Sequence, residues 1–336
     1  MRASRAMVVV VGIGLVGCVP SPDRCVDQSR SAGERLECTV PGWTDRGTYL
    51  HLPDDWDGVT PAPAIVLLHG AGGSRQGADL VTCPDGDDAS PACLAALATA
   101  AGYLVIVPDG TGQRPVRRLR SWNAGGGDAG LACLSPIPCR LDVDDLAYLD
   151  DVLAEVELAA PIDPARLYAA GLSNGAAMSH RLACEWPGRL AAIATVGGQN
   201  QHADAGGACA GDTPVLDVHG VDDPIWPYAG GVSEVVPDQG VYTSAATTME
   251  GWRQRNGCAE TFVEVELPDV DPDDGTRVVQ RTWDGCDATT VHLAVDGGGH
   301  TWPGGHQYFG VDTIGRVTRD LGSEALLAFF EAHARP

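Results

Sequence analysis

The sequence contains no lysine, so all 22 of its basic residues are arginines, and 45 acidic residues give the 336-residue chain a formal net charge of −23. The absence of lysine excludes Schiff-base, pyridoxal-phosphate and P-loop chemistry, because each of these needs a lysine amine. The excess of negative charge disfavours nucleic acid as a partner, because phosphate backbones are bound through patches of lysine and arginine. We therefore expect an uncharged partner and no nucleic acid.

The sequence also lacks the C-x-x-C spacing that is typical of structural zinc sites. An acidic segment at residues 269–275 superficially resembles a calcium-binding loop. The EF-hand pattern, however, needs glycine and glutamate where this chain has Asp274 and Gln280. An acidic surface turn is the favoured interpretation of this segment, and we expect neither a metal ion nor a cofactor.

The first residues are typical of an export signal rather than of a folded element. A short basic region with Arg2 and Arg5 precedes an apolar stretch that is too short to span a bilayer. Residues 15–18, Leu-Val-Gly-Cys, follow it and resemble the lipobox of bacterial lipoproteins. We predict a lipoprotein signal peptide over residues 1–17, a lipid on Cys18, and an extracytoplasmic protein that contacts a membrane only through this anchor. The alternative is an ordinary signal peptide in which Cys18 has no special role.

The chain has 11 cysteines, and a lipidated Cys18 leaves an even number in a compartment where disulfides persist. Connectivity does not follow from the sequence alone, but short loops make pairs of sequential neighbours the simplest arrangement. We therefore expect a fold stapled by disulfides. The predicted pairs are Cys25–Cys38, Cys83–Cys93, Cys133–Cys139, Cys184–Cys209 and Cys258–Cys286.

Apolar runs of strand length alternate with helical patterns over most of the chain, which is typical of an α/β fold with a mostly parallel sheet. No internal repeat and no linker of domain size interrupts this alternation. We predict one catalytic domain over residues 47–336, preceded by a tether and an N-terminal edge segment over residues 18–46. The expected strands are residues 64–68, 104–108, 166–171, 191–196, 214–218 and 291–295, and the expected helices are residues 91–101, 142–158, 174–185, 244–256 and 323–333.

The strongest chemical motif is a G-x-S-x-G sequence at residues 171–175, Gly-Leu-Ser-Asn-Gly. An apolar strand precedes it and a helical run follows it. A sharp turn from strand to helix strains the backbone at the serine, and the flanking glycines permit the close approach that the turn needs. The serine oxygen then projects above the sheet at the positive end of the following helix. Ser173 is therefore the predicted nucleophile.

A serine nucleophile needs a base, and the base needs an acid that orients it. In a fold of this kind the chain order is serine, acid, histidine. Asp222 and Asp223 follow the strand expected at residues 214–218, and His300 follows the strand expected at residues 291–295 on a glycine-rich loop. The His-Gly-x-x-Asp spacing favours Asp223 over Asp222 as the acid of the triad. The alternative for each of these residues is a place in a surface turn.

An oxyanion hole is expected at the end of the strand at residues 64–68. That strand runs into His69-Gly-Ala-Gly-Gly, a loop type that offers backbone N–H donors. We predict that the amides of Ala71 and Asn174 are the two donors, each of which stabilises the tetrahedral intermediate by roughly 3–4 kcal/mol. His69 is predicted to fix the turn rather than to act in catalysis.

Taken together, these motifs resemble those of the secreted poly(3-hydroxybutyrate) depolymerases and the feruloyl and acetylxylan esterases. The resemblance covers nearly all of the expected catalytic domain. It implies an α/β-hydrolase fold with helices on both faces of the sheet, and ester hydrolysis through Ser173, Asp223 and His300 without metal or cofactor. The motifs that carry it are Gly-Leu-Ser-Asn-Gly, His219-Gly-x-x-Asp223 followed by Pro-Tyr at residues 227–228, and Gly-His300-Thr-Trp-Pro-Gly.

The function that follows is an exported serine carboxylic-ester hydrolase acting on polymer-derived or short-acyl esters, such as feruloyl or acetyl esters or poly(3-hydroxybutyrate)-type polyester. Trp122, Asn123, Trp226 and Trp302 fall on loops expected at the carboxyl side of the strands and are predicted to bind the substrate. Core packing is the alternative for the tryptophans. Two other functions stay open, a lipoprotein that binds polymer without catalysis and a peptidase on the same fold.

Overall fold

The N-terminal segment falls outside the part of the chain for which a structure can be described. The predicted signal peptide at residues 1–17 and the predicted lipid on Cys18 therefore lie outside the described residues. Within the part that is described, no helix is long and apolar enough to cross a membrane. The computed structural model describes residues 23–43, 45–112, 119–127, 131, 133, 136–236 and 240–336.

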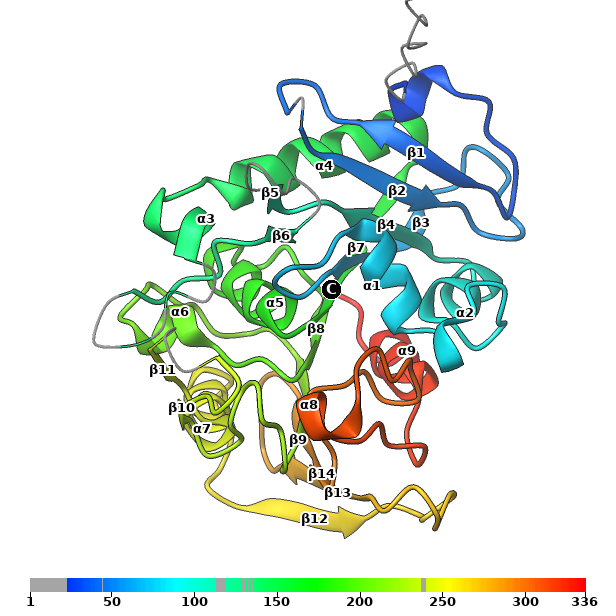
Figure 1. Ribbon diagram of the computed structural model, residues 1–336. Coiled ribbons are helices and arrows are strands. Elements are labelled where there is room, and N and C mark those ends of the chain that lie inside the picture. Colours follow the sequence, from blue (N-terminus) through cyan, green and yellow to red (C-terminus); the bar gives the residue numbers. More distant parts are fainter. Residues whose placement is uncertain are drawn as a thin grey trace, which may run out of the picture.

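A ten-stranded sheet forms the centre of the molecule, in the order β1-β2-β4-β3-β7-β8-β9-β14-β13-β12 (Figure 1). The strands from β4 to β14 in this order run parallel, whereas the two strands at each edge pair antiparallel. The strands are β1 (Arg35–Thr39), β2 (Gly47–His51), β3 (Ala62–Leu68), β4 (Leu104–Pro108), β7 (Ile162–Leu172), β8 (Ala192–Val196), β9 (Val215–Gly220), β12 (Phe262–Glu266), β13 (Arg277–Trp283) and β14 (Thr290–Asp296). Two short hairpins lie apart from this sheet, β5 (Thr111–Gly112) with β6 (Arg120–Ser121) and β10 (Gly231–Val232) with β11 (Val241–Tyr242).

Each apolar run that was expected to be a strand forms one of the parallel strands of this sheet. These strands are β3, β4, β7, β8, β9 and β14. Strands that are buried on both faces are continuous apolar runs in sequence, which is why they can be found without a structure. The antiparallel edge strands lack this signal, and β12 is exposed along its whole length. β1 comes from the segment expected to be a tether and edge, and it pairs with β2 as part of the same sheet.

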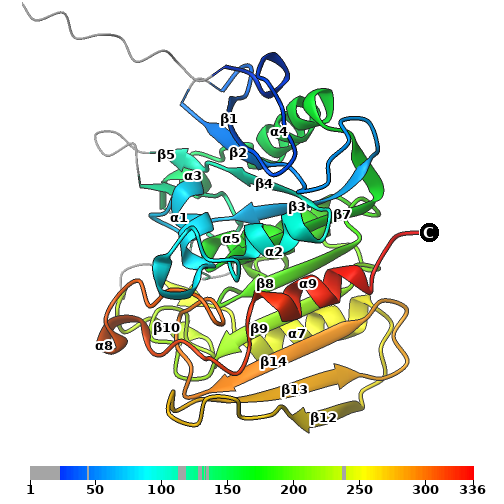
Figure 2. The same cartoon turned by 90° about the vertical axis from the view of Figure 1, so that its right-hand side faces the viewer.

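Helices cover both faces of the sheet, with α1, α2 and α9 on one face and α4, α5 and α7 on the other (Figure 2). Each expected helix has a counterpart among α2, α4, α5, α7 and α9. The helices are α1 (Arg75–Val81), α2 (Leu94–Ala100), α3 (Pro136–Arg140), α4 (Asp145–Ala159), α5 (Asn174–Glu185), α6 (Gln201–Asp204), α7 (Ala245–Arg255), α8 (Val311–Ile314) and α9 (Ser323–Glu331), with the 3-10 turns η1 (Cys25–Asp27) and η2 (Pro84–Gly86).

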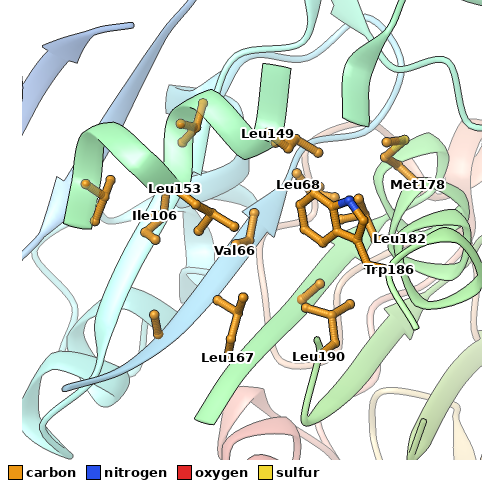
Figure 3. Packing of buried hydrophobic residues seen from close by; sticks show 14 of the residues in the cluster. Val66, Leu68, Ile106, Leu149, Leu153, Leu167, Met178, Leu182, Trp186 and Leu190 are labelled. Carbon is orange, nitrogen blue, oxygen red and sulfur yellow. The ribbon is translucent and has the colours of Figure 1, made fainter. Parts of the chain in front are cut away.

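Each face of the sheet has its own hydrophobic core. On one face, Leu153 of α4 and Leu182 of α5 pack with Val66 and Leu68 of β3 (Figure 3). On the other face, Phe330 of α9 belongs to a second core with the helices α1 and α2. Burying one such side chain stabilises the fold by roughly 1.5–3 kcal/mol, so the two cores fix the sheet from which the site loops extend.

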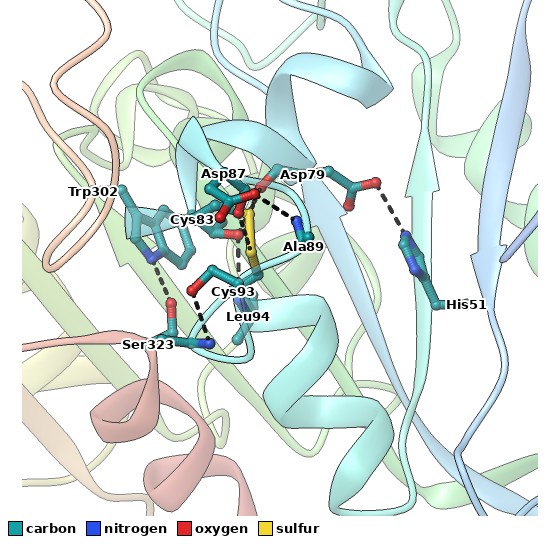
Figure 4. The surroundings of a disulfide bond; sticks show 12 residues. His51, Asp79, Cys83, Asp87, Ala89, Cys93, Leu94, Trp302 and Ser323 are labelled. Carbon is teal, nitrogen blue, oxygen red and sulfur yellow. Dashed lines mark hydrogen bonds and ion pairs between the residues drawn. A yellow bond between two sulfur atoms is a disulfide. The ribbon is translucent and has the colours of Figure 1, made fainter. Parts of the chain in front are cut away.

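The disulfides of the described residues are the five pairs of sequential neighbours expected from the sequence. Figure 4 shows one of them, Cys83–Cys93, beside the pair formed by His51 and Asp79, whose Nε2 and Oδ2 atoms are 3.1 Å apart. The fold is therefore stapled by disulfides, as predicted. The pairs are Cys25–Cys38, Cys83–Cys93, Cys133–Cys139, Cys184–Cys209 and Cys258–Cys286.

Removing the disulfide between Cys184 and Cys209 should lower the free energy of unfolding by about 3 kcal/mol. The bond closes a loop with a sequence separation of 25 residues, and the loss of this cross-link gives the unfolded chain more conformational freedom. Denaturant unfolding of the Cys184→Ala/Cys209→Ala variant measures the effect. An unfolding midpoint equal to that of the unchanged protein would contradict a stabilising role for this bond.

Candidate active site

Ser173 stands at a sharp turn between β7 and α5, with a backbone φ of 60° that residues other than glycine rarely adopt. The turn brings the backbones so close that only glycine fits on either side of the serine. A Cβ atom at Gly171 would overlap the backbone of Gly175, and one at Gly175 would overlap the carbonyl of Leu68 on β3. The serine side chain does not cap α5, which leaves its hydroxyl available.

Asp223 and His300 come from the loops after β9 and β14, which are parallel neighbours in the sheet. The Nδ1 atom of His300 lies 2.7 Å from Oδ2 of Asp223. The other carboxylate oxygen accepts hydrogen bonds of 2.8 Å from the backbone amides of Ile225 and Trp226. Asp222 is exposed, so the structure brings Asp223 and not its neighbour to the histidine.

The carboxyl group of Asp223 is held in its ionised form. Burial by itself would raise its pKa, but the charge of His300 and hydrogen bonds from His219 and His300 lower the pKa to about 2. Such a carboxylate can orient an imidazole and stabilise it when it becomes charged.

Two glycines after β8 allow the serine and the histidine–aspartate pair to approach each other. A Cβ atom at Gly197 would lie 3.3 Å from Nδ1 of His300 and 3.5 Å from Oδ2 of Asp223. A Cβ atom at Gly198 would overlap the carbonyl of Ser173. Both Ser173 and His300 line the same cavity, so the chain brings the three predicted triad residues to one place.

The predicted oxyanion donors flank the serine. Asn174 is the first residue of α5, where backbone amides have no partner within the helix. The loop after β3 passes close to the serine, since a Cβ atom at Gly70 would lie 3.3 Å from Cβ of Ser173. The next residue, Ala71, is exposed, and its amide has no hydrogen-bond acceptor within the described residues. Both amides can therefore donate to an oxygen bound at the serine.

His69 is a structural histidine, in agreement with the role expected for it. Its Nδ1 atom lies 2.8 Å from the carbonyl oxygen of Gly70, and its Nε2 atom accepts a hydrogen bond of 2.9 Å from the amide of Gly110. Burial lowers the pKa of His69 to about 4. A neutral imidazole therefore joins the loop after β3 to the loop after β4.

Trp122, which was predicted to bind substrate, is fully buried and is not among the residues that line the cavity. Its indole Nε1 donates to the carbonyl oxygen of His69 at 2.9 Å. The side chain of Asn174 bonds the backbone of Trp122 in both directions, accepting from its amide at 2.7 Å and donating to its carbonyl at 3.1 Å. Trp122 therefore connects the loop after β3 with the turn at the serine.

Asn123 and Trp302, which were also predicted to bind substrate, are likewise buried and are not among the residues that line the cavity. The amide of Asn123 donates to Oδ2 of Asp145 at 2.6 Å, which anchors the segment to the start of α4. The indole of Trp302 donates to Oγ of Ser323 at 2.9 Å (Figure 4). Trp226 does line the cavity, although it is only 1% exposed and donates from its indole to a backbone carbonyl.

A cavity of about 570 Å³ opens beside Ser173 and His300. Its walls are largely apolar, and within the described residues no aspartate, glutamate or arginine lines it. His306, Tyr308 and Phe309 belong to this lining but were not predicted from the sequence. Their one sequence signal is that they follow His300 within a few residues. The cavity suits an uncharged group that is bound next to the serine.

The described residues offer no group of three or more His, Cys, Asp or Glu side chains that could hold a metal ion. In the acidic turn at residues 269–275, the carboxylates bond to protein groups instead. Asp269 pairs with Arg277 at 2.7 Å, and Asp274 accepts a hydrogen bond of 2.6 Å from the amide of Thr276. The turn is thus held by bonds to residues that follow it, and the amides of Val270 and Asp271 also donate to Asp320.

The parallel sheet, the strand–serine–helix turn and the chain order of the three residues define an α/β-hydrolase. No family model matches the sequence. Over 275 residues the chain is 30% identical to a Nocardia uniformis subsp. tsuyamanensis protein named "Putative esterase NocK", covering 78% of this chain and 71% of that protein. It is 25% identical to the feruloyl esterase C of Emericella nidulans, covering 74% of each.

A solved structure confirms the fold. The acetyl xylan esterase from Aspergillus awamori superposes with a TM-score of 0.52 at 14% identity, covering 89% of this chain and 99% of that one. The chain belongs to the feruloyl esterase-like family of α/β-hydrolases, and the resemblance seen in its motifs is confirmed. The protein is a carboxylic ester hydrolase.

Replacing Trp122 by phenylalanine should lower kcat about tenfold and leave KM nearly unchanged. The ring volume is largely kept, but the bond to the His69 carbonyl is lost, so the loop with the Ala71 amide is held less firmly. Trp252→Phe is the matched control, because Trp252 is equally buried and also donates one indole hydrogen bond, to His180 at 3.0 Å. Steady-state kinetics of the two variants compare them, and equal losses of kcat would contradict the positioning role of Trp122.

Proposed function

We propose that the protein hydrolyses esters through an acyl-enzyme, with Ser173 as nucleophile, His300 as base and Asp223 as the acid that orients it. The observation that carries this proposal is the meeting of the strained serine turn and the His300–Asp223 pair at one cavity. The roles follow from the chemistry, because a serine hydroxyl is a weak nucleophile until a neighbouring imidazole removes its proton.

In the first step, Ser173 attacks the ester carbonyl while His300 takes the serine proton at Nε2. Asp223 accepts from Nδ1 and stabilises the imidazolium that forms. The amides of Ala71 and Asn174 donate to the oxyanion of the tetrahedral intermediate. The proton then passes from His300 to the departing alcohol. In the second step, His300 activates a water molecule that releases the acid and regenerates the serine.

For the substrate, we propose an ester with an uncharged aromatic or short acyl group, of the feruloyl or acetyl kind. The supporting observation is the cavity of about 570 Å³, whose lining is largely apolar and has no aspartate, glutamate or arginine among the described residues. The names of the relatives point the same way, since they include feruloyl esterase C and acetyl xylan esterase. Soluble hydroxybutyrate oligoesters share these properties and are the second candidate.

We further propose that the protein works outside the cytoplasm, attached to a membrane by a lipid on Cys18. The five disulfides favour an oxidising compartment, because such bonds are rare where cellular thiols are kept reduced. The lipobox-like residues 15–18 support the anchor.

Ser173→Ala should reduce kcat by about 10⁶ without changing the fold, because loss of a triad serine removes the nucleophile. Asp223→Asn should also reduce kcat, by about 10⁴, whereas Asp222→Asn should retain most of the activity and serves as its matched control. Hydrolysis of a p-nitrophenyl ester, with circular dichroism to check folding, measures all three. Ser173→Ala turnover above a hundredth of the unchanged enzyme would refute the assignment.

Across a panel of esters, kcat/KM should be higher for methyl ferulate, acetyl esters and hydroxybutyrate oligomers than for palmitoyl esters. Short and aromatic acyl groups can bind beside the serine without a further surface, whereas a palmitoyl chain needs an extended apolar surface for its tail. The panel uses one enzyme preparation and equal concentrations of dispersed substrate. A preference for the palmitoyl ester would overturn the substrate proposal while leaving the triad intact.

A further inference from the structure

A second imidazole contacts the carboxylate that we assign to the triad. His219 lies near the end of β9 and is 1% exposed. Its Nε2 atom is 3.2 Å from Oδ2 of Asp223, the same oxygen that receives Nδ1 of His300 at 2.7 Å. One carboxylate oxygen therefore lies between two histidines, of which only one also lines the cavity.

A glutamine determines which nitrogen of His219 carries the proton. The Nε2 amide nitrogen of Gln199 lies 2.7 Å from Nδ1 of His219 and 3.2 Å from Oδ2 of Asp217. The reverse orientation of the amide would turn its oxygen toward the Asp217 carboxylate, which is unfavourable. Nδ1 of His219 is therefore an acceptor, and its Nε2 proton is shared between Asp223 and the carbonyl oxygen of Trp226 at 2.9 Å.

Asp217 is a fixed negative charge beneath the site. It is fully buried, and it accepts hydrogen bonds of 2.8 Å from Oγ1 of Thr195 and 2.9 Å from Nδ1 of His292. Burial opposes its charge, but the hydrogen bond and the charge of His292 lower the pKa of Asp217 to about 2. The charge of Asp217 fixes the orientation of the Gln199 amide, and this amide fixes the tautomer of His219.

We propose that His219 is a positioning residue for the triad: it holds Asp223 so that Oδ2 stays on His300, and it limits how strongly this carboxylate attracts the His300 proton. The inference rests on the proposed triad. The carboxylate is bound on all sides, because its other oxygen is held by two backbone amides. A donor on Oδ2 also draws negative charge away from the His300 side, which weakens the hold on the imidazolium.

The protonation state of His219 does not alter this role. Burial disfavours its charged form, but the hydrogen bond to Asp223 and the charges of Asp223 and Asp217 raise its pKa. Nε2 carries a proton in both charge states, so the contact with Asp223 is kept. The other titratable groups near Asp223 are the phenols of Tyr242 and Tyr308, and Tyr228 packs edge-on against the His219 ring. Asp217 on β9 is in turn approached by His180 on α5 and His292 on β14.

His219→Leu removes the donor, so kcat should fall roughly 10- to 100-fold with little change in KM. In the pH profile of kcat/KM, the acid limb should move to higher pH by about half a pH unit to one pH unit. Asp223 then holds the His300 proton more strongly. His219→Gln keeps an N–H group at a similar reach and should restore most of kcat and the original acid limb. Profiles of p-nitrophenyl acetate hydrolysis between pH 5 and 9 measure these changes.

His180→Leu is the matched control, because His180 is equally buried and lies 3.9 Å from Asp217, but among the described residues it forms no ion pair or hydrogen bond with Asp223. It should lose stability to a similar degree and keep the acid limb of the unchanged enzyme. If His219→Leu does not fold, Gln199→Leu takes its place: it frees His219 from its fixed tautomer and should shift the limb in the same direction. An unmoved limb in the folded variant, or a His219→Gln enzyme as impaired as His219→Leu, would overturn the proposal. Failure of the triad itself would appear separately, as activity retained in Ser173→Ala and Asp223→Asn.

Discussion

The close approach of backbones around Ser173 is the constraint on which the rest of the site depends. β3, β7, β8 and α5 meet there with so little space that a Cβ atom at Gly171, Gly175 or Gly198 would overlap a neighbouring backbone. This contact puts the serine in its strained conformation and brings the loop after β3 to its side. Gly197 leaves room for the pair of Asp223 and His300, and the imidazole of His300 lines the same cavity as the serine. The geometry of this site therefore depends on the glycines as much as on the side chains that we propose to react.

Around this contact, hydrogen bonds between loops hold the serine turn, the loop after β3 and the Asp223 carboxylate in place. On one side, Trp122 and Asn174 join the oxyanion loop to the serine turn. On the other side, backbone amides and two histidines hold the Asp223 carboxylate. Preorganisation of this kind means that little rearrangement is needed when charge develops in the transition state. The lining of the cavity has no aspartate, glutamate or arginine among the described residues, so its walls are largely apolar.

The sequence predicted the parallel strands, the main helices and the disulfide pairs because each leaves a local pattern: continuous apolar runs, helical periodicity and closely spaced cysteines. It could not predict where loop side chains point. Trp122 and Trp302 follow strands as substrate-binding residues do, but their indoles turn inward because acceptors lie there. His219 was named only as part of a motif, and a role for it or for Gln199 was missed for a related reason. Their contacts cross between β8 and β9, and only the fold brings Asp217, Gln199 and Asp223 around one imidazole.

The central claim is that Ser173, activated by His300, forms the acyl-enzyme. The most direct measurement is mass spectrometry of peptides from enzyme treated with a fluorophosphonate, which reacts with activated serines. The account predicts one adduct per chain, on the peptide that contains Ser173, and none when His300 is replaced by alanine. Labelling of another serine, or equal labelling of Ser173 without His300, would contradict it.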